Sequence, residues 1–167
     1  MAGNKKPAKK YRPKKILLDP VGYTLEGMTP ISQHDSYLVD LKIKNHLAMY
    51  NLTRGKAARG DMMSLIEMHN MIEALMRRGF AQEYTQIAKA GYAALKSVLA
   101  RGLKNGRFVL RGPEISALNA HMELHDAIME VLTVRDIERA LVEIRKEYAL
   151  GLMENVIDLR PEELLTT

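Results

Sequence analysis

The sequence predicts an all-α protein, a helical bundle of about five helices preceded by a basic N-terminal arm. Along five segments between Asp35 and Gly151, apolar residues recur at spacings of three and four, the period of an amphipathic helix. Short loops that contain Gly, Asn or Pro separate these segments, as is typical of bundles. The sequence has no GxGxxG or GxxxxGK[ST] motif and no alternation of strand and helix patterns. The Rossmann and P-loop classes are therefore excluded.

The chain divides into four regions by composition. Residues 1–15 form the basic arm, 16–34 an irregular segment rich in Pro and Gly, 35–151 the bundle, and 152–167 a C-terminal tail. A length of 167 residues with 47% apolar residues suits one folded domain. The chain has no Cys, which excludes a disulfide framework, an iron–sulfur cluster and a cysteine nucleophile.

The first helix is expected to begin at Asp35, where the helical period starts. Its apolar stripe contains Leu38, Leu41, Ala48 and Leu52, and Tyr37, Leu47 and Tyr50 widen it. Gly55 and Gly60 bracket the loop that follows.

The second helix is expected to begin after Asp61, because a carboxylate at the N-cap can accept a hydrogen bond from an unpaired amide of the first turn. Its apolar side contains Met62, Leu65, Met68, Ile72, Leu75 and Met76. Gly79 followed by Phe80 predicts a helix stop, in which the glycine takes the left-handed conformation and the phenylalanine folds back.

Three further helices follow. The third is expected over about 81–101, ended by Gly102, and the turn signal Asn105-Gly106 comes next. Pro113 suits the first turn of the fourth helix. Thr133 and Asp136 resemble a capping box, so the fifth helix is expected to begin at Val134 and to end near Gly151.

The net charge of +5 is unevenly distributed. Residues 1–15 carry +7, residues 16–111 carry +5, and residues 112–167 carry −7. The arm has almost no apolar residues, so we expect it to be disordered when free. Its start is not a signal peptide and no segment reaches 18 consecutive apolar residues, which predicts a cytoplasmic protein without a membrane span.

Basic residues gather at two loops besides the arm. The candidate nucleic-acid-binding residues of the arm are Lys5, Lys6, Lys9, Lys10, Tyr11, Arg12, Lys14 and Lys15. Those of the two loops are Arg54, Lys56 and Arg59, and Arg101, Lys104, Arg107 and Arg111, with Lys96 beside them. In an up-and-down bundle both loops lie at one end, so up to eight cations are expected in one patch. Cations near helix C-termini are also favourable without any ligand, and that explanation suffices for two or three of them.

The histidines are the only plausible metal ligands in a chain without Cys. His121 and His125 are four residues apart and share a helix face, and His69 and His46 lie on semi-apolar faces. The zinc motif that needs Glu directly after the first His is absent, as is Glu-x-x-His. We therefore expect no metal and no other cofactor, and interpret each His as a partly buried polar residue with a partner such as Glu73. Convergence of three or four of them on a metal, in a histidine-based metalloenzyme, is the alternative.

No other catalytic arrangement is evident. None of the five serines lies in a nucleophile-elbow motif. Carboxylate pairs such as Glu143 and Glu147 are expected on a solvated helix exterior. The sequence therefore favours a protein that is not an enzyme.

Two long segments resemble uncharacterised small helical accessory proteins of bacteriophage and prophage genomes. They are YLVDLKIKNHLAMYNLTRGKAARGDMMSLIEMHNMIEALMRRGF (37–80) and GRFVLRGPEISALNAHMELHDA (106–127). The resemblance implies a bacterial or phage setting and an accessory role, and it assigns no activity and no site residues.

Two functions remain open on this evidence. The first is an accessory protein that binds nucleic acid, or a nucleoprotein complex, through the arm and the basic loops, because Lys and Arg gain affinity by releasing counterions from phosphates. The second is a protein–protein adaptor or inhibitor, as in host takeover or defence evasion, acting through the acidic C-terminal third or the Met-rich second helix. On that helix Met63 and Met71 lie off the main stripe and are expected to form an exposed apolar patch with Phe80. The acidic third is expected to meet a basic partner or the chain's own basic half, and the latter would favour homo-oligomers.

Overall fold

The computed structural model describes residues 27–30 and 35–151, and this part of the chain is helical. Its helices are α2 (Asp35–Thr53), α3 (Arg59–Arg77), α4 (Thr85–Asn105), α5 (Gly112–Val131) and α6 (Val134–Ala149), with the short 3₁₀ helix η2 (Gln82–Tyr84) before α4. No strand occurs among the described residues, and Pro30 forms one isolated bridge to Thr133. The prediction of an all-α bundle with about five helices is confirmed. The arm and the tail lie outside the described residues.

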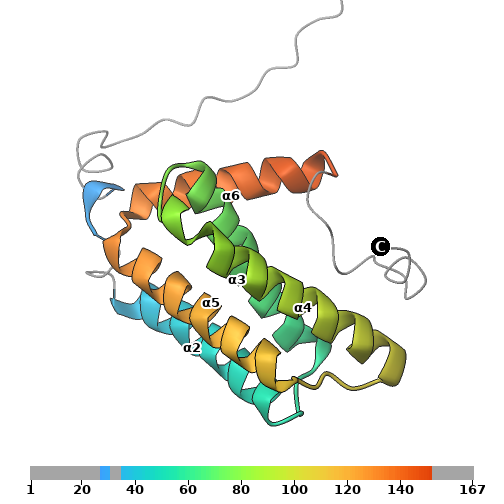
Figure 1. The fold of residues 1–167 in the computed structure, drawn as a ribbon. Helices are drawn as coiled ribbons and strands as arrows, with labels where there is room; N and C mark the ends of the chain where they lie inside the picture. The colour runs from blue at the N-terminus through green and yellow to red at the C-terminus, as the bar shows by residue number, and fades with distance from the viewer. Residues whose placement is uncertain (1–26, 31–34, 152–167) are drawn as a thin grey trace, which may run out of the picture.

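Helices α2 to α5 run alternately up and down, and α6 crosses them at one end (Figure 1). Helix α3 is central, because α2, α4, α5 and α6 all pack against it. This position explains its composition, since apolar or small residues are buried around most of its circumference. No helix of the described part is both long enough and apolar enough to cross a lipid bilayer.

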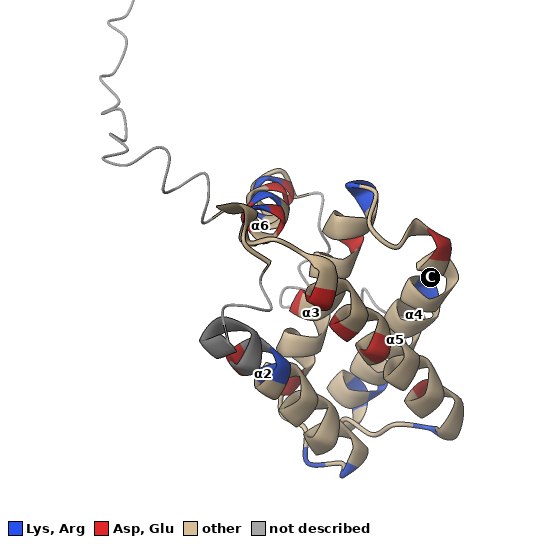
Figure 2. Cartoon of the chain, turned by 90° about the vertical axis from the view of Figure 1, so that its left-hand side faces the viewer, with Lys and Arg blue, Asp and Glu red and all other residues tan. Residues whose placement is uncertain are grey.

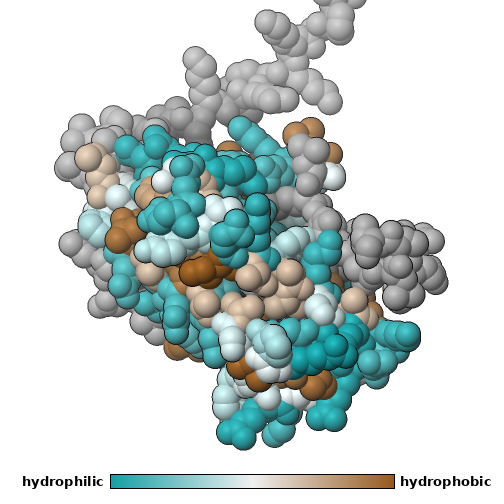
Figure 3. Space-filling view, viewed as in Figure 1, coloured by the Kyte–Doolittle hydropathy of each residue, from teal (hydrophilic) through white to brown (hydrophobic). Residues whose placement is uncertain are grey.

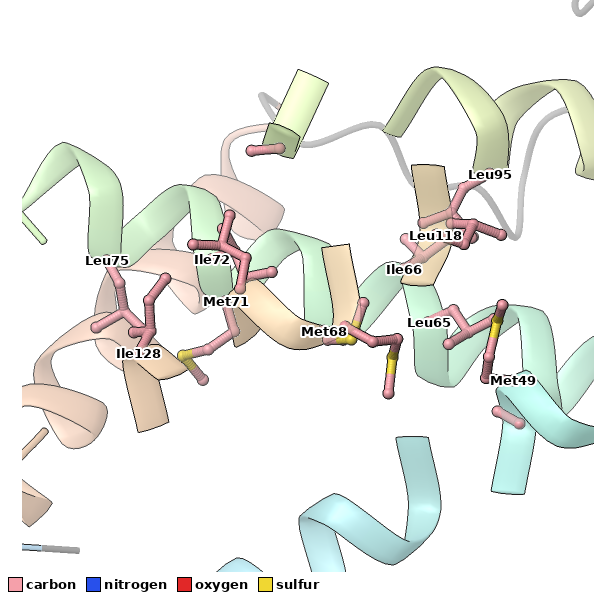
Figure 4. Packing of buried hydrophobic residues seen from close by; sticks show 14 of the residues in the cluster. Met49, Leu65, Ile66, Met68, Met71, Ile72, Leu75, Leu95, Leu118 and Ile128 are labelled. Carbon is pink, nitrogen blue, oxygen red and sulfur yellow. The ribbon is translucent and has the colours of Figure 1, made fainter. Parts of the chain in front are cut away.

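The core is one continuous cluster built around α3. Leu65, Ile72 and Leu75 are fully buried, and each such side chain contributes about 1.5–3 kcal/mol by leaving water. Figure 4 shows Leu75 pointing toward Ile128 of α5 and Leu65 toward Met49 of α2. Different stretches of α3 therefore contact different partner helices.

Two predicted helix ends are confirmed by their hydrogen bonds. At the end of α3, Gly79 has φ 100°, and the amides of Gly79 and Phe80 donate to the carbonyls of Met76 and Leu75 over 2.9 and 3.1 Å. This is the pattern in which glycine reverses the chain at a C-terminus. At the start of α6, the Asp136 amide donates to Thr133 Oγ1 and the Thr133 amide donates to Asp136 Oδ2, as a capping box requires.

Two other predicted helix boundaries are wrong. Helix α3 begins at Arg59, so Asp61 is its third residue, and its Oδ2 accepts a hydrogen bond from the Ala58 amide over 2.8 Å. Gly102 does not end α4, which continues to Asn105 and stops at Gly106 with φ 70°. Gly102 is glycine for another reason: it is buried against Phe108, and a Cβ there would collide with the ring.

Candidate nucleic-acid interface and the buried histidines

The two basic loops meet at one end of the bundle. Arg107 Nε donates to the backbone carbonyl of Gly55 over 3.2 Å and so joins the α4–α5 loop to the α2–α3 loop. Figure 2 shows Lys and Arg on both loops at the lower end, and hydrophilic side chains cover that end in Figure 3. The prediction that the loops lie together is confirmed.

Six cations are exposed at this end, which we call the basic end. They are Arg54, Lys56, Arg59, Lys104, Arg107 and Arg111. Arg59 and Arg111 lie at the N-termini of α3 and α5, where the helix dipole disfavours a positive charge. A favourable interaction with helix C-termini therefore does not explain why these two positions are basic. The side chains of Lys56, Lys104 and Arg111 make no ion pair with the described part of the chain.

Arg101 differs from these six because its charge is already used within the protein. Its guanidinium lies 2.6 Å from Glu114 Oε1 and 2.9 Å from the Val109 carbonyl, and its side chain is 21% exposed. These contacts hold the start of α5 against α4. Lys96 lies over the ring of Tyr92, 5.6 Å from its centroid. The predicted patch of eight cations is therefore smaller, with six exposed members.

The arm candidates lie outside the described residues. These are Lys5, Lys6, Lys9, Lys10, Tyr11, Arg12, Lys14 and Lys15. Their role stays a prediction.

A chain of three polar side chains runs from the surface into the core. Glu73 Oε1 lies 3.5 Å from His69 Nε2, and His69 Nδ1 lies 3.3 Å from His121 Nε2. His69 stacks on Tyr92 with ring centroids 4.3 Å apart. Gly91 admits the His121 ring, because a Cβ at that position would collide with it. Glu73, which the sequence suggested as a partner for the histidines, thus lies beside His69, and His69 and His121 are more deeply buried than expected.

The pKa values of Glu73 and His121 are both lowered, which indicates where the protons lie in this row of three side chains. His69, as a hydrogen-bond partner, lowers the pKa of Glu73 despite its partial burial. With its Nε2 proton toward Glu73, His69 accepts at Nδ1 from His121 Nε2. Burial, together with the nearby charges of His69 and His125, lowers the pKa of His121 to about 3. His121 is therefore neutral at pH 7, and its Nδ1 has no partner among the described residues.

The other two candidate histidines meet at a different carboxylate. Asp126 Oδ2 lies 2.9 Å from His46 Nε2, and its Oδ1 lies 3.2 Å from His125 Nδ1. The hydrogen bond from His125 lowers the pKa of Asp126 the most, and the bond from His46 adds to it. Asp126 is therefore ionised, and His125 carries its proton on Nδ1. The four histidines thus form two separate pairs, and no group of three or more His, Asp or Glu in the described part could hold a metal ion.

The exposed apolar surface differs from the predicted one. Met71 is buried and Phe80 packs against the core, so they form no patch with Met63. Three of the exposed apolar side chains, Ile43, Leu47 and Tyr50, lie instead on α2, each more than half exposed. Leu47 and Tyr50 were expected to widen the core stripe. The sequence contained a signal for this exposed stripe, since α2 carries apolar residues on more than one side.

The acidic third pairs with the chain's own basic half. Arg77 at the end of α3 lies 3.0 Å from Glu143 and 2.9 Å from Glu147 of α6. The sequence predicted that these two carboxylates lie on a solvated helix exterior. They pair instead with Arg77 of a neighbouring helix. Lys42 also lies 3.6 Å from Glu130.

Comparison with known proteins adds no relative to this description: no protein-family model, curated protein or solved structure matches the chain.

Proposed function

We propose that the protein binds the phosphate backbone of nucleic acid through the basic end and the N-terminal arm. The observation that supports this function best is the contact of Arg107 with Gly55, because it gathers six exposed cations from two loops 52 residues apart in sequence. The N-termini of α3 and α5 lie at the same end. Each carries a carboxylate in its first turn, Asp61 or Glu114, that accepts from a cap amide, so the exposed cations supply the attraction for phosphates.

Binding of this kind is independent of base sequence. Lys and Arg neutralise phosphates and release counterions, so affinity falls steeply with salt. The arm adds seven further cations within residues 1–15. It should therefore contribute more of the affinity than the six cations of the basic end. The resemblance to phage accessory proteins stays a prediction that is compatible with this role.

Fluorescence anisotropy with labelled DNA and RNA, measured across a salt series, tests the proposal. Removing two cations with Lys56→Ala/Lys104→Ala should reduce the slope of log affinity against log salt by about 1–2. Arg78→Ala/Lys89→Ala removes the same charge from exposed residues at the opposite end, and should leave the slope unchanged. Equal effects of both pairs, or binding that does not depend on salt, would contradict the proposal.

The exposed stripe on α2 favours a second candidate, binding of a protein partner. Ile43, Leu47 and Tyr50 are 58%, 54% and 55% exposed and lie on one side of the helix. Such an apolar stripe is typical of an interface with a protein or a second copy of the chain. Sizing chromatography of the wild type and of Leu47→Glu tests it, because a wild-type oligomer that dissociates in the variant supports a homo-oligomer. A monomer in both cases leaves only a different protein as the partner.

A further inference from the structure

A pocket of about 390 Å³ opens between α2, α3 and α6. Helices α2 and α6 lie on two sides of α3 (Figure 2). The apolar part of its walls is formed by Met63, Met68, Met71, Ile137, Leu141 and Ile144. The volume is in the range of small-molecule sites, and the flexible methionine side chains can adapt to a ligand.

Two polar side chains in this pocket are buried without a partner. Asn45 and His125 are 2% and 1% exposed, and neither Asn45 Nδ2 nor His125 Nε2 has a hydrogen-bond partner in the described part. They lie on facing turns of α2 and α5, because the residues that follow them, His46 and Asp126, are hydrogen-bonded over 2.9 Å. Buried polar atoms are rarely left unpaired, so this pair indicates a polar group on whatever fills the pocket.

The hydrogen-bonding character of the two atoms is defined. Asn45 Nδ2 can only donate. His125 Nδ1 lies 3.2 Å from Asp126 Oδ1, which places the Nδ1 proton toward that carboxylate, so His125 Nε2 can accept. At the mouth, Lys44 and Glu67 neutralise each other across 2.8 Å, and Arg145 is exposed to solvent. Asn70 and Tyr148, which also line the pocket, bond to each other. The pocket therefore offers one unpaired donor and one unpaired acceptor, without an unpaired buried charge.

We propose that this pocket binds a small uncharged molecule with an apolar body and an amide or lactam group. The carbonyl oxygen of that group accepts from Asn45 Nδ2, and its N–H donates to His125 Nε2. The apolar body lies against the methionines of α3 and the apolar residues of α6. This site is separate from the basic end, and it stands whether or not the protein binds nucleic acid.

Octanamide is a suitable probe, with N,N-dimethyloctanamide as the matched analogue that lacks the N–H donor. Titration of the full-length protein labelled with ¹³C at the methionine methyls should shift Met63, Met68 and Met71. Met62 and Met129 are in the core and do not line the pocket, so they should not move. The dimethyl analogue should bind about tenfold more weakly, because it leaves His125 Nε2 unpaired.

Two tryptophan variants on α6 distinguish this pocket from unspecific binding. Leu141→Trp fills the pocket and should abolish the methyl shifts. Val142→Trp, at a neighbouring residue that is 49% exposed and outside the pocket, should leave them unchanged. Thermal melting confirms that both variants fold. Equal affinity for the two amides, equal effects of the two variants, or no shift at the pocket methionines would overturn the proposal, leaving water as the occupant.

Discussion

His121 Nε2 lies 3.3 Å from His69 Nδ1 at the centre of the bundle, and both rings are almost fully buried. The contact joins α5 to the central helix α3. A proton added to His121 would go to its buried Nδ1, which has no hydrogen-bond partner in the described part, so a charge there would be buried without compensation. The packing of the core is therefore coupled to the protonation of His121.

Acid should destabilise the protein well above the range in which carboxylates titrate. Burial lowers the pKa of His121 from 6.5 to about 3. The unfolded chain thus binds a proton between these values that the folded chain excludes. Stability rises with pH wherever the unfolded state binds more protons. It should be complete above pH 6.5 and decrease steadily toward pH 3, by up to several kcal/mol at about 1.4 kcal/mol per pKa unit.

Urea unfolding between pH 7.5 and 4.5 measures this dependence. The lowered pKa values of Glu73 and Asp126 act in the same direction, but only below the pKa values of these groups in the unfolded chain. His121→Leu should therefore flatten the profile between pH 6.5 and 4.5. A wild-type stability that is constant over this interval would show that His121 protonates in the folded state without cost.

Gly91→Ala should destabilise the protein by about 1–3 kcal/mol, the usual cost of inserting a methyl group into a filled core. The new Cβ would collide with the His121 ring and displace it from His69. Gly60→Ala is the matched control, because Gly60 lies in the first turn of α3 with open space around it. There alanine should stabilise by up to about 1 kcal/mol through its helix propensity. Thermal or urea unfolding of the two variants should give opposite signs.

How far the sequence predicts this fold depends on the range of each signal. Thr133 and Gly79 mark helix ends correctly because their hydrogen-bond partners lie within five residues. Gly102 resembles a helix stop equally well in sequence. Its actual reason is a contact with Phe108, which depends on how the following loop folds back. Local signals thus predict helix boundaries correctly, except where a residue such as glycine is present because of a tertiary contact.

The site residues show the same limit. The sequence could place both basic loops at one end, because alternating helices require it. It could not predict that Arg101 pairs with Glu114 and leaves the exposed patch, because that pairing depends on side-chain geometry. Convergence of three or four histidines was only the alternative in the sequence, and their division into two pairs follows from how α2 and α3 each pack against α5. The pocket could not be predicted, because its lining residues come from α2, α3, α5 and α6 and meet only in the folded bundle.

Arg77→Ala should loosen α6 from α3. The guanidinium lies within 3.0 Å of carboxylate oxygens of both Glu143 and Glu147, and the three side chains are partly exposed. Exposed pairs contribute little individually, so the loss should be about 1 kcal/mol for the network. A double-mutant cycle with Glu147→Gln isolates the pair by urea unfolding. A coupling energy that is zero at low salt would contradict a stabilising role, and a positive one should decrease as salt is added.

Asn45→Leu should stabilise the protein while it weakens the pocket as a polar site. Asn45 Nδ2 is buried without a partner, and an unsatisfied polar group costs about 1–3 kcal/mol. Asn70→Leu is the matched control in the same pocket: Asn70 Nδ2 donates to the Tyr148 hydroxyl over 3.0 Å, so its loss should destabilise. Urea unfolding without added amide should therefore show opposite signs for the two substitutions. A destabilising Asn45→Leu would mean that its amide is already satisfied in the free protein. An increase in stability for Asn45→Leu would show a trade-off between stability and function. The free protein then tolerates an unpaired donor because a ligand uses it.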